Sequence, residues 1–241
     1  MSLVESSIVN RIMKFSSENL EEAIDAAVSV LLKGGIVALP TDTLYGLSTL
    51  LPYSDKLYAL KKRSAKKPLG IFISNHTALA EVSKQTISDE LARSLLPGPV
   101  TLMFERLATL PSNFNPGVKN VACRIPDALI VSKICSRIKQ PLAQTSANLS
   151  GDAVNPMRIE DFEELIPEID LVLDNGPIMP RVEGGSTIVD LTNTGYFKVV
   201  RRSYPYFTGI PKKFRGRSRR LFIHVSAISV HFPNELLFSP D

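Results

Sequence analysis

Residues 34–47 read GGIVALPTDTLYGL, and this stretch joins an apolar segment to a polar one. Four apolar residues between a glycine pair and a proline are typical of a short buried strand. Thr41, Asp42 and Thr43 follow directly, although burying polar side chains without partners costs free energy. Two interpretations are open: a turn whose side chains cap the backbone, or a ligand held at the end of a strand. Considered alone, the stretch favours the turn.

The composition is that of a globular protein. The chain has 241 residues, of which 44% are hydrophobic and 22% charged, so it can bury the core of one large domain or two small ones. No run of about 18 apolar residues occurs, and we expect no stable membrane insertion. The two cysteines form no CxxC pair, which indicates a reducing compartment. We expect the cytoplasm, with mitochondria as a second location.

The basic residues are unevenly distributed. Residues 201–220 carry eight lysines and arginines and no acid, and the rest of the chain has 20 basic against 24 acidic residues. The formal net charge of +4 therefore comes from one short segment. It is weak evidence that the whole protein binds nucleic acid.

Apolar periodicity and turn residues predict interspersed helices and strands. We expect helices at 20–32, 55–62, 77–84, 88–96, 126–138 and 159–166. We expect strands at 36–39, 70–74, 100–105, 121–125, 142–145, 170–173, 186–191 and 196–201. This order predicts a single α/β domain around a twisted, mixed, open sheet flanked by helices. We place it at residues 18–203, after an N-terminal extension (1–17) and before a basic and apolar C-terminal tail (204–241).

The sequence lacks the residues and motifs that several common kinds of active site need. The three histidines stand at 76, 224 and 231, which does not favour a Ser-His-Asp hydrolase or a histidine metal site. We therefore expect no metal bound by the protein alone. Neither GxxxxGK[ST] nor GxGxxG after a strand occurs, so phosphate binding would have to use side chains and turns.

Residues 61–67 read KKRSAKK, with five basic residues in seven positions. One interpretation is a solvated helix end, where cations interact favourably with the helix dipole. The other is a polyphosphate site, because arginine offers a planar fork and lysine a mobile charge.

Polar residues follow or enter other predicted strands as well. Arg124 stands in an apolar strand, Ser146 follows LAQT, Ser186 follows a glycine pair, and Arg201 ends a strand. Each alone favours turn chemistry. If they converge in space, together with the basic cluster, they indicate a ligand site.

Seven motifs occur in a fixed order over about residues 20–202: PTDTLYGL, KxR with KPL, LLPGPVTL, RIP, TSANLSG, GSTIVDL and VVR. In the order and spacing of these motifs the chain resembles the YrdC/Sua5 family, and the residues within them are most similar to those of the eukaryotic single-domain members. The resemblance implies an α/β fold with a twisted open sheet and a large basic concave cavity.

The same resemblance implies L-threonylcarbamoyladenylate synthase activity. Members of the family join L-threonine, bicarbonate and ATP, with Mg²⁺ accompanying the nucleotide, and release pyrophosphate. This is a nucleotidyltransferase reaction. The product supplies the threonylcarbamoyl group of N6-threonylcarbamoyladenosine in tRNA, and a separate KEOPS-type complex performs the transfer.

The resemblance also implies roles for single residues. Lys61 and Arg63 are implied as catalytic residues, with Lys61 near the phosphates. The implied threonine-binding residues are Thr43, Arg124 and Ser186. The implied ATP-binding residues are Arg63, Lys67, Asn120, Ser146, Asn148 and Arg201.

Two positions depart from the family pattern. Phe72 stands where many prokaryotic members have a histidine, and Gln144 where alanine or serine is common. A further ATP contact of the family falls nearest to Val154 or Asn155. The resemblance ends after Arg201, so it implies nothing about the tail.

The residues themselves permit this chemistry. Attack of the threonine amine on bicarbonate and of the carbamate on the α-phosphate needs positioning and charge stabilisation, and no protein nucleophile. The alternative is a non-catalytic module of the same fold that binds double-stranded RNA through its basic clusters. Few aromatic residues accompany those clusters to stack on bases, which favours the enzyme. A third interpretation is carbamoyl transfer in a maturation factor that shares the fold. This sequence does not contain the accessory domains of such factors, which disfavours it.

Overall fold

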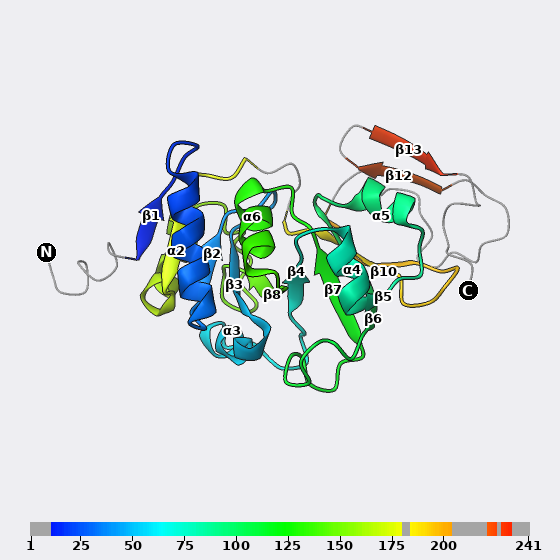
Figure 1. Ribbon diagram of the computed structural model, residues 1–241, viewed down its shortest axis with the longest axis horizontal. Helices are drawn as coiled ribbons and strands as arrows, with labels where there is room; N and C mark the ends of the chain where they lie inside the picture. Colours follow the sequence, from blue (N-terminus) through cyan, green and yellow to red (C-terminus); the bar gives the residue numbers. More distant parts are fainter. Residues whose placement is uncertain (1–10, 180–183, 204–220, 226–227, 233–241) are drawn as a thin grey trace, which may run out of the picture.

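One mixed sheet of eleven strands organises the computed structural model, which describes residues 11–179, 184–203, 221–225 and 228–232 (Figure 1). Ten strands follow one another across the sheet in the order β1 (Ile12–Lys14), β9 (Leu171–Asp174), β2 (Val37–Leu39), β3 (Gly46–Leu50), β8 (Leu142–Ser146), β4 (Gly70–Phe72), β7 (Asn120–Arg124), β6 (Val100–Arg106), β10 (Thr187–Asp190) and β11 (Lys198–Arg201). The eleventh, β5 (Ser83–Lys84), pairs with β6. The predicted α/β domain with an open mixed sheet is confirmed.

The registers of the central strands decide which side chains share a row. Phe72 pairs with Leu142 of β8 on one side and with Arg124 of β7 on the other. Gly70, two residues earlier on β4, pairs with Gln144. Because side chains two residues apart point to the same face of a sheet, these rows place Arg124 of β7 and Gln144 of β8 on one face, on either side of β4.

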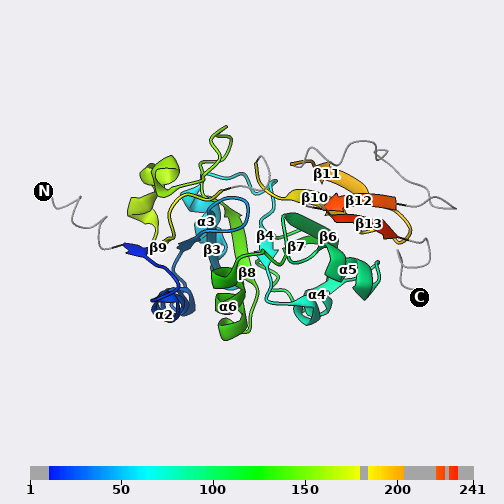
Figure 2. The ribbon, with the colours of Figure 1, turned by 90° about the horizontal axis from the view of Figure 1, so that it is seen from above.

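Helices cover the sheet and close two hydrophobic clusters (Figure 2). They are α2 (Leu20–Leu32), α3 (Asp55–Leu60), α4 (His76–Val82), α5 (Asp89–Leu95) and α6 (Leu129–Ile138), with two 3₁₀ helices, η1 (Leu51–Tyr53) and η2 (Ile159–Glu168). Residues of α2 and α6 pack with Leu142 and Phe72 in one cluster. Residues of α3, α4, α5 and η2 belong to the other.

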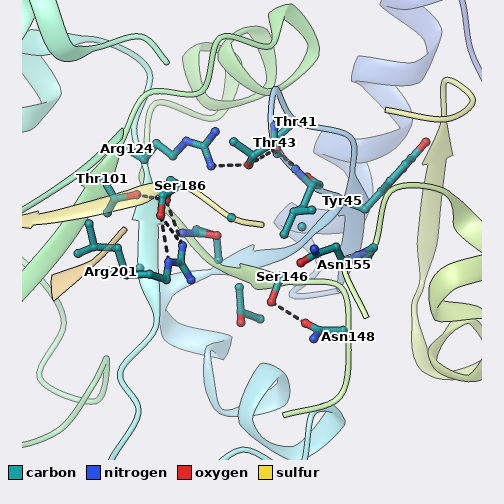
Figure 3. Close-up of a pocket in the computed structure, with 18 of the residues that line it drawn as sticks. Thr41, Thr43, Tyr45, Thr101, Arg124, Ser146, Asn148, Asn155, Ser186 and Arg201 are labelled. Atoms are coloured by element: carbon teal, nitrogen blue, oxygen red, sulfur yellow. Dashed lines mark hydrogen bonds between the residues drawn. The ribbon is translucent and has the colours of Figure 1, made fainter. Parts of the chain in front are cut away.

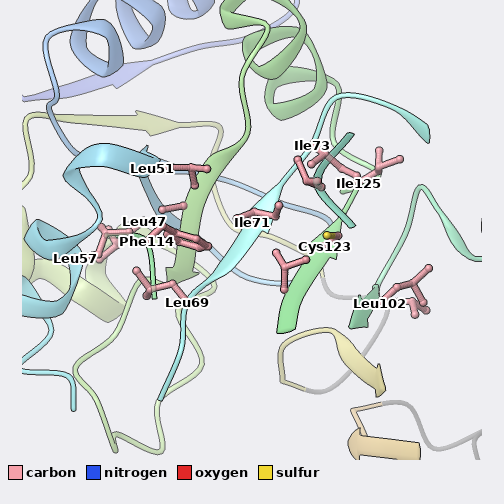
Figure 4. Close-up of a cluster of buried hydrophobic side chains, with 14 of the residues drawn as sticks. Leu47, Leu51, Leu57, Leu69, Ile71, Ile73, Leu102, Phe114, Cys123 and Ile125 are labelled. Atoms are coloured by element: carbon pink, nitrogen blue, oxygen red, sulfur yellow. The ribbon is translucent and has the colours of Figure 1, made fainter. Parts of the chain in front are cut away.

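Strand β4 shows how the alternation of side chains separates the two clusters. Ile71 is fully buried in the second cluster with Cys123, whereas its neighbour Phe72 belongs to the first (Figure 4). Cys123 and Cys135 are free and buried, as expected of small apolar side chains.

The structure adds three strands of the main sheet to those predicted: β1, β3 and β5. Strand β5 corrects the predicted helix at 77–84, because α4 ends at Val82 and the next two residues pair with β6. Strand β3 carries Ser48 and Thr49, so its sequence lacks the apolar run of a buried strand, yet all five of its residues are buried. The Thr49 hydroxyl donates to the Gly35 carbonyl at 2.8 Å, which satisfies it inside the sheet. Strand β1 lies in the segment assigned to the N-terminal extension and pairs in parallel with β9.

One predicted helix has a different form. Residues 159–168 form the 3₁₀ helix η2, which is kinked at Phe162 and contains Pro167. The non-helical backbone at Phe162 interrupts the hydrogen-bond pattern of an α-helix, and Pro167 near the end of η2 has no amide hydrogen to donate to it.

The described part of the tail forms a separate element. Strands β12 (Leu221–Val225) and β13 (Ile228–Phe232) pair with each other in an antiparallel sheet of their own. The basic cluster at 212–220 lies outside the described residues. Within the part of the chain that is described, no helix is long and apolar enough to cross a membrane.

Candidate active site

A cavity of about 290 Å³ lies against the central strands, at the point where the polar strand ends predicted from the sequence meet (Figure 3). Its lining is rich in hydroxyl groups, small residues and arginines. It includes Thr41, Thr43, Tyr45, Gly46, Arg63, Gly70, Phe72, Thr101, Arg124, Gln144, Ser146, Asn148, Asp152, Asn155, Ser186 and Arg201.

The turn after β2 is built by Thr41. Its hydroxyl accepts hydrogen bonds from the backbone amides of Thr43 (3.1 Å) and Leu44 (3.2 Å) and donates to the Leu44 carbonyl (2.6 Å). This is the backbone capping that the sequence favoured for the stretch. Because Thr41 caps the turn, the hydroxyl of Thr43 is left to face the cavity, so capping and a ligand site coexist.

Arg124 crosses the cavity wall toward this turn, and it is only 4% exposed. Its Nη1 donates to the Thr43 hydroxyl at 2.9 Å and its Nε to the Gly98 carbonyl at 3.1 Å. Its Nη2 forms a buried ion pair with Asp42. Burial lowers the pKa of Arg124, and Asp42 opposes that shift. A buried charge of this kind needs its partner.

Ser186, just before β10, and Arg201, at the end of β11, form a second polar group. The Ser186 hydroxyl lies 2.6 Å from the Thr101 hydroxyl, and its carbonyl accepts from Arg201 Nε (3.0 Å) and Nη2 (2.8 Å). Gly185 makes room for this arrangement, because a Cβ there would lie 2.7 Å from Arg201 Nη2. A side chain at position 185 would therefore push the Arg201 guanidinium away from Ser186.

Lys61 lies behind the SAN motif, and only 1% of its surface is exposed. Its Nζ contacts the Ser146 carbonyl and lies 3.2 Å from Asn148 Oδ1, while the Ser146 hydroxyl donates to the same Oδ1 at 2.6 Å. Burial lowers the pKa of Lys61 to about 7, with a smaller contribution from Arg63. In this structure Lys61 holds the motif in place and does not line the cavity.

The KKRSAKK segment divides between the two interpretations. Arg63 lines the cavity and its Nε and Nη2 donate to the carbonyls of Lys67 (2.8 Å) and Pro68 (3.0 Å). The Lys67 side chain is exposed and lies outside the cavity lining, as does Asn120 at the start of β7. The implied ATP contacts of Lys67 and Asn120 stay predictions.

Three arginines belong to the described part of the lining, and we call Arg63, Arg124 and Arg201 the arginine cluster. The pKa of Arg201 is lowered by burial and by the charge of Arg63, and that of Arg124 is lowered further by Arg201. Repulsion among these cations favours an anionic ligand. Against these three arginines, the described lining has one carboxylate, that of Asp152, so the cavity is basic as predicted.

Two contributors were not among the predicted site residues. Asp42 neutralises Arg124, and Thr101 shares a hydrogen bond with Ser186. Thr101 lies in the PGPVTL motif, so its presence in that motif was a usable signal. The pairing of Asp42 with a residue 82 positions away has no signal in a single sequence.

Residues 29–203 match the family model Sua5/YciO/YrdC, whose description reads "Telomere recombination". The chain belongs to the Sua5/YciO/YrdC family. The match covers the strands from β2 to β11, and with them every element that lines the cavity.

Relatives in the Sua5/YciO/YrdC family carry a common name, threonylcarbamoyl-AMP synthase. The human protein is 40% identical over 187 residues, which are 75% of this chain and 67% of that protein. The mouse protein is 41% identical over 187 residues, 75% of this chain and 66% of that protein. The matched segment thus spans about two thirds of the length of these relatives.

Solved structures of the family share the fold. Sua5 of Pyrococcus abyssi, solved in complex with L-threonine, is 29% identical with a TM-score of 0.71, covering 80% of this chain and 56% of that one. Escherichia coli YciO has a TM-score of 0.69 at 20% identity, covering 80% and 94% of the two chains, and it supports the fold alone.

Proposed function

We propose that this chain is an L-threonylcarbamoyladenylate synthase, a nucleotidyltransferase that makes threonylcarbamoyl-AMP and pyrophosphate from L-threonine, bicarbonate and ATP. Relatives named as synthases indicate an enzyme. The observation that carries the proposal is the arginine cluster in a cavity lined by hydroxyl groups. All three substrates are anions or carry a carboxylate, and each relieves repulsion within the cluster.

The threonine end of the cavity is proposed at Thr43, Arg124 and Ser186. The Sua5 structure with bound L-threonine supports an amino-acid site in this fold. Arg124 uses three of its five N–H groups in protein contacts, so donors remain for a carboxylate. Hydroxyl groups around the ligand would discriminate threonine from valine, because valine leaves buried polar groups unpaired.

The nucleotide end is proposed at Arg63, Ser146, Asn148 and Arg201, which line the cavity. In Figure 3, Ser146, Asn148 and Arg201 lie away from the Thr43 turn. Among the described residues no group of three or more His, Cys, Asp or Glu side chains gathers to hold a metal. Of the lining residues that the structure describes, Asp152 is the one with a carboxylate. This donor set fits Mg²⁺ that arrives with the phosphates of ATP as part of the substrate, assisted by Asp152.

The reaction proceeds by positioning. The amine of threonine attacks the carbon of bicarbonate, water leaves, and a carbamate forms. A carbamate oxygen then attacks the α-phosphorus of ATP, and pyrophosphate leaves with the electrons of the bond that breaks. The arginines stabilise the developing charge, and holding the reactants together supplies on the order of 7–11 kcal/mol of the barrier.

Pyrophosphate release from ATP tests the proposal. We expect release that requires both L-threonine and bicarbonate, and that Arg63→Ala and Arg124→Ala abolish. Arg137→Ala is the matched control, because Arg137 forms exposed ion pairs with Glu21 and Asp25 on the outer side of α2 and α6. Release that ignores threonine contradicts the function, and near-normal rates in the first two variants contradict the site.

The product threonylcarbamoyl-AMP is proposed to pass to a KEOPS-type transferase that modifies tRNA. The names of the relatives support this role over the alternative of a non-catalytic RNA-binding module. Arg63 points into the cavity instead of outward, which removes one cation from the surface that such a module would use.

A further inference from the structure

Gln144 on β8 lies on the floor of the cavity, in a space that a glycine leaves open. Its strand partner is Gly70, and a Cβ at Gly70 would come within 2.6 Å of the Gln144 Nε2 and 3.2 Å of the Ala122 carbonyl. Any side chain at position 70 would therefore displace the amide. The amide is seated against the sheet because its neighbour has no side chain.

The amide of Gln144 makes no side-chain hydrogen bond within the described part of the chain, although it is partly buried. Its surroundings differ in this respect, since Thr43, Ser146 and Ser186 all bond to other protein groups. A primary amide offers two donors and an acceptor, and leaving them unpaired in a partly buried site is unfavourable. A ligand is the natural partner.

The position of Gln144 selects the part of the ligand. On β8 it stands two residues before Ser146, at the proposed nucleotide end. On the other side, its partner Gly70 stands two residues before Phe72, which pairs with Arg124 at the proposed threonine end. Strands are about 4.8 Å apart and alternate residues about 6.6 Å, so Gln144 lies between the two ends.

We propose that Gln144 binds bicarbonate and the carbamate formed from it, an inference that rests on the proposed function. Its two N–H groups donate hydrogen bonds to the oxygens of bicarbonate or of the carbamate. Its carbonyl accepts a hydrogen bond from the threonine nitrogen, which becomes the carbamate nitrogen. The threonine carboxylate has Arg124, and the phosphates have Arg63 and Arg201. A neutral amide suits bicarbonate and the carbamate. The carbamate must form and then attack the α-phosphorus, which a tight ion pair with an arginine would hinder.

Steady-state kinetics of Gln144→Leu test this, with each substrate varied in turn. We expect the KM for bicarbonate to rise about tenfold, the change that loss of a neutral hydrogen bond produces. Dissociation constants of L-threonine and ATP, measured by calorimetry, should stay within about twofold. Gln140→Leu is the control, because Gln140 is exposed just before the same strand.

A second variant keeps the test independent of the fate of the first. Gly70→Ala leaves Gln144 in the sequence but displaces its amide, so it should raise the same KM. An unchanged bicarbonate KM in a folded Gln144→Leu enzyme overturns the inference and leaves the proposed function standing. A change in the dissociation constant of ATP alone would place the amide against the adenine ring, which also overturns the inference. Wild-type protein without threonine-dependent pyrophosphate release overturns both.

Discussion

The buried charge of Arg124 depends on a single carboxylate. Asp42 is its ion-pair partner, and the second oxygen of that carboxylate, Oδ2, is buried with no hydrogen-bond partner among the described residues. We predict that Asp42→Ala lowers the free energy of unfolding by about 3–5 kcal/mol, because it leaves a cation buried and uncompensated. Urea denaturation measures the change, and L-threonine binding should weaken in the same variant.

A double variant separates stability from binding in this pair. Asp42→Ala with Arg124→Met removes both charges, and we expect it to recover much of the lost stability without regaining threonine binding. A double variant that is as unstable as Asp42→Ala alone would contradict the assignment of the destabilisation to an unpaired arginine.

Lys61 makes stability depend on pH. Its pKa falls from 10.5 for an ordinary lysine to about 7 through burial, so between these values the unfolded chain binds more protons than the folded one. Stability should therefore rise with pH across this window, by up to about 1.4 kcal/mol per unit. Urea denaturation of wild type against Lys61→Met from pH 7.5 to 9.5 measures it.

The comparison has a built-in control. Lys66 is exposed, so Lys66→Met should follow the wild-type curve at every pH. If wild type and Lys61→Met change in parallel, the lysine is not buried as a charge that must be neutralised.

Strand β1 lies before residue 18, where we predicted that the domain begins, so its contribution to stability bears on that boundary. Ile12 and Met13 of β1 pack against the two hydrophobic clusters, and the strand covers the edge of β9. Removing residues 1–17 should lower the free energy of unfolding by about 2 kcal/mol or more, since apolar burial and strand pairing are lost together. Removing residues 1–10 keeps the strand and serves as the control. Equal stability of the two truncations would contradict a structural role for β1.

The elements that the sequence predicted are those with a clear apolar pattern. Helix α6 and strands β6 and β7 fall close to their expected bounds, because their buried faces consist of aliphatic residues. Strand β3 was missed because it buries the hydroxyls of Ser48 and Thr49, and the partner of Thr49, the Gly35 carbonyl, is revealed only by the folded chain. Strand β1 was missed because three residues at a sheet edge carry too little pattern.

Over the whole molecule, the sequence located the cavity-lining motifs but not the contacts among them. Thr43, Arg124, Ser146, Asn148, Ser186 and Arg201 line the cavity, as does Arg63. Strand register seats Gln144 over Gly70, and the place of Lys61 at the C-terminal end of α3 brings its Nζ to the SAN motif. Register depends on distant segments, so a single sequence cannot supply it.

The boundary at residue 203 can be tested on the intact fold. Strands β1 to β11 form one sheet, β12 and β13 form another, and the family match ends at residue 203. We predict that a chain ending at Ser203 keeps its free energy of unfolding within about 1 kcal/mol and still releases pyrophosphate. Failure of this chain to fold would show that residues 204–241 pack on the domain.

The arginine cluster has a consequence for turnover. Cations that attract a triphosphate also attract the diphosphate that leaves it, since pyrophosphate keeps most of the negative charge and loses the nucleoside. After the chemical step, the cavity therefore holds its inorganic product by the same forces that brought ATP in. The enzyme should be inhibited by pyrophosphate at modest concentrations, and added salt, by screening the cluster, should speed its release while weakening ATP binding.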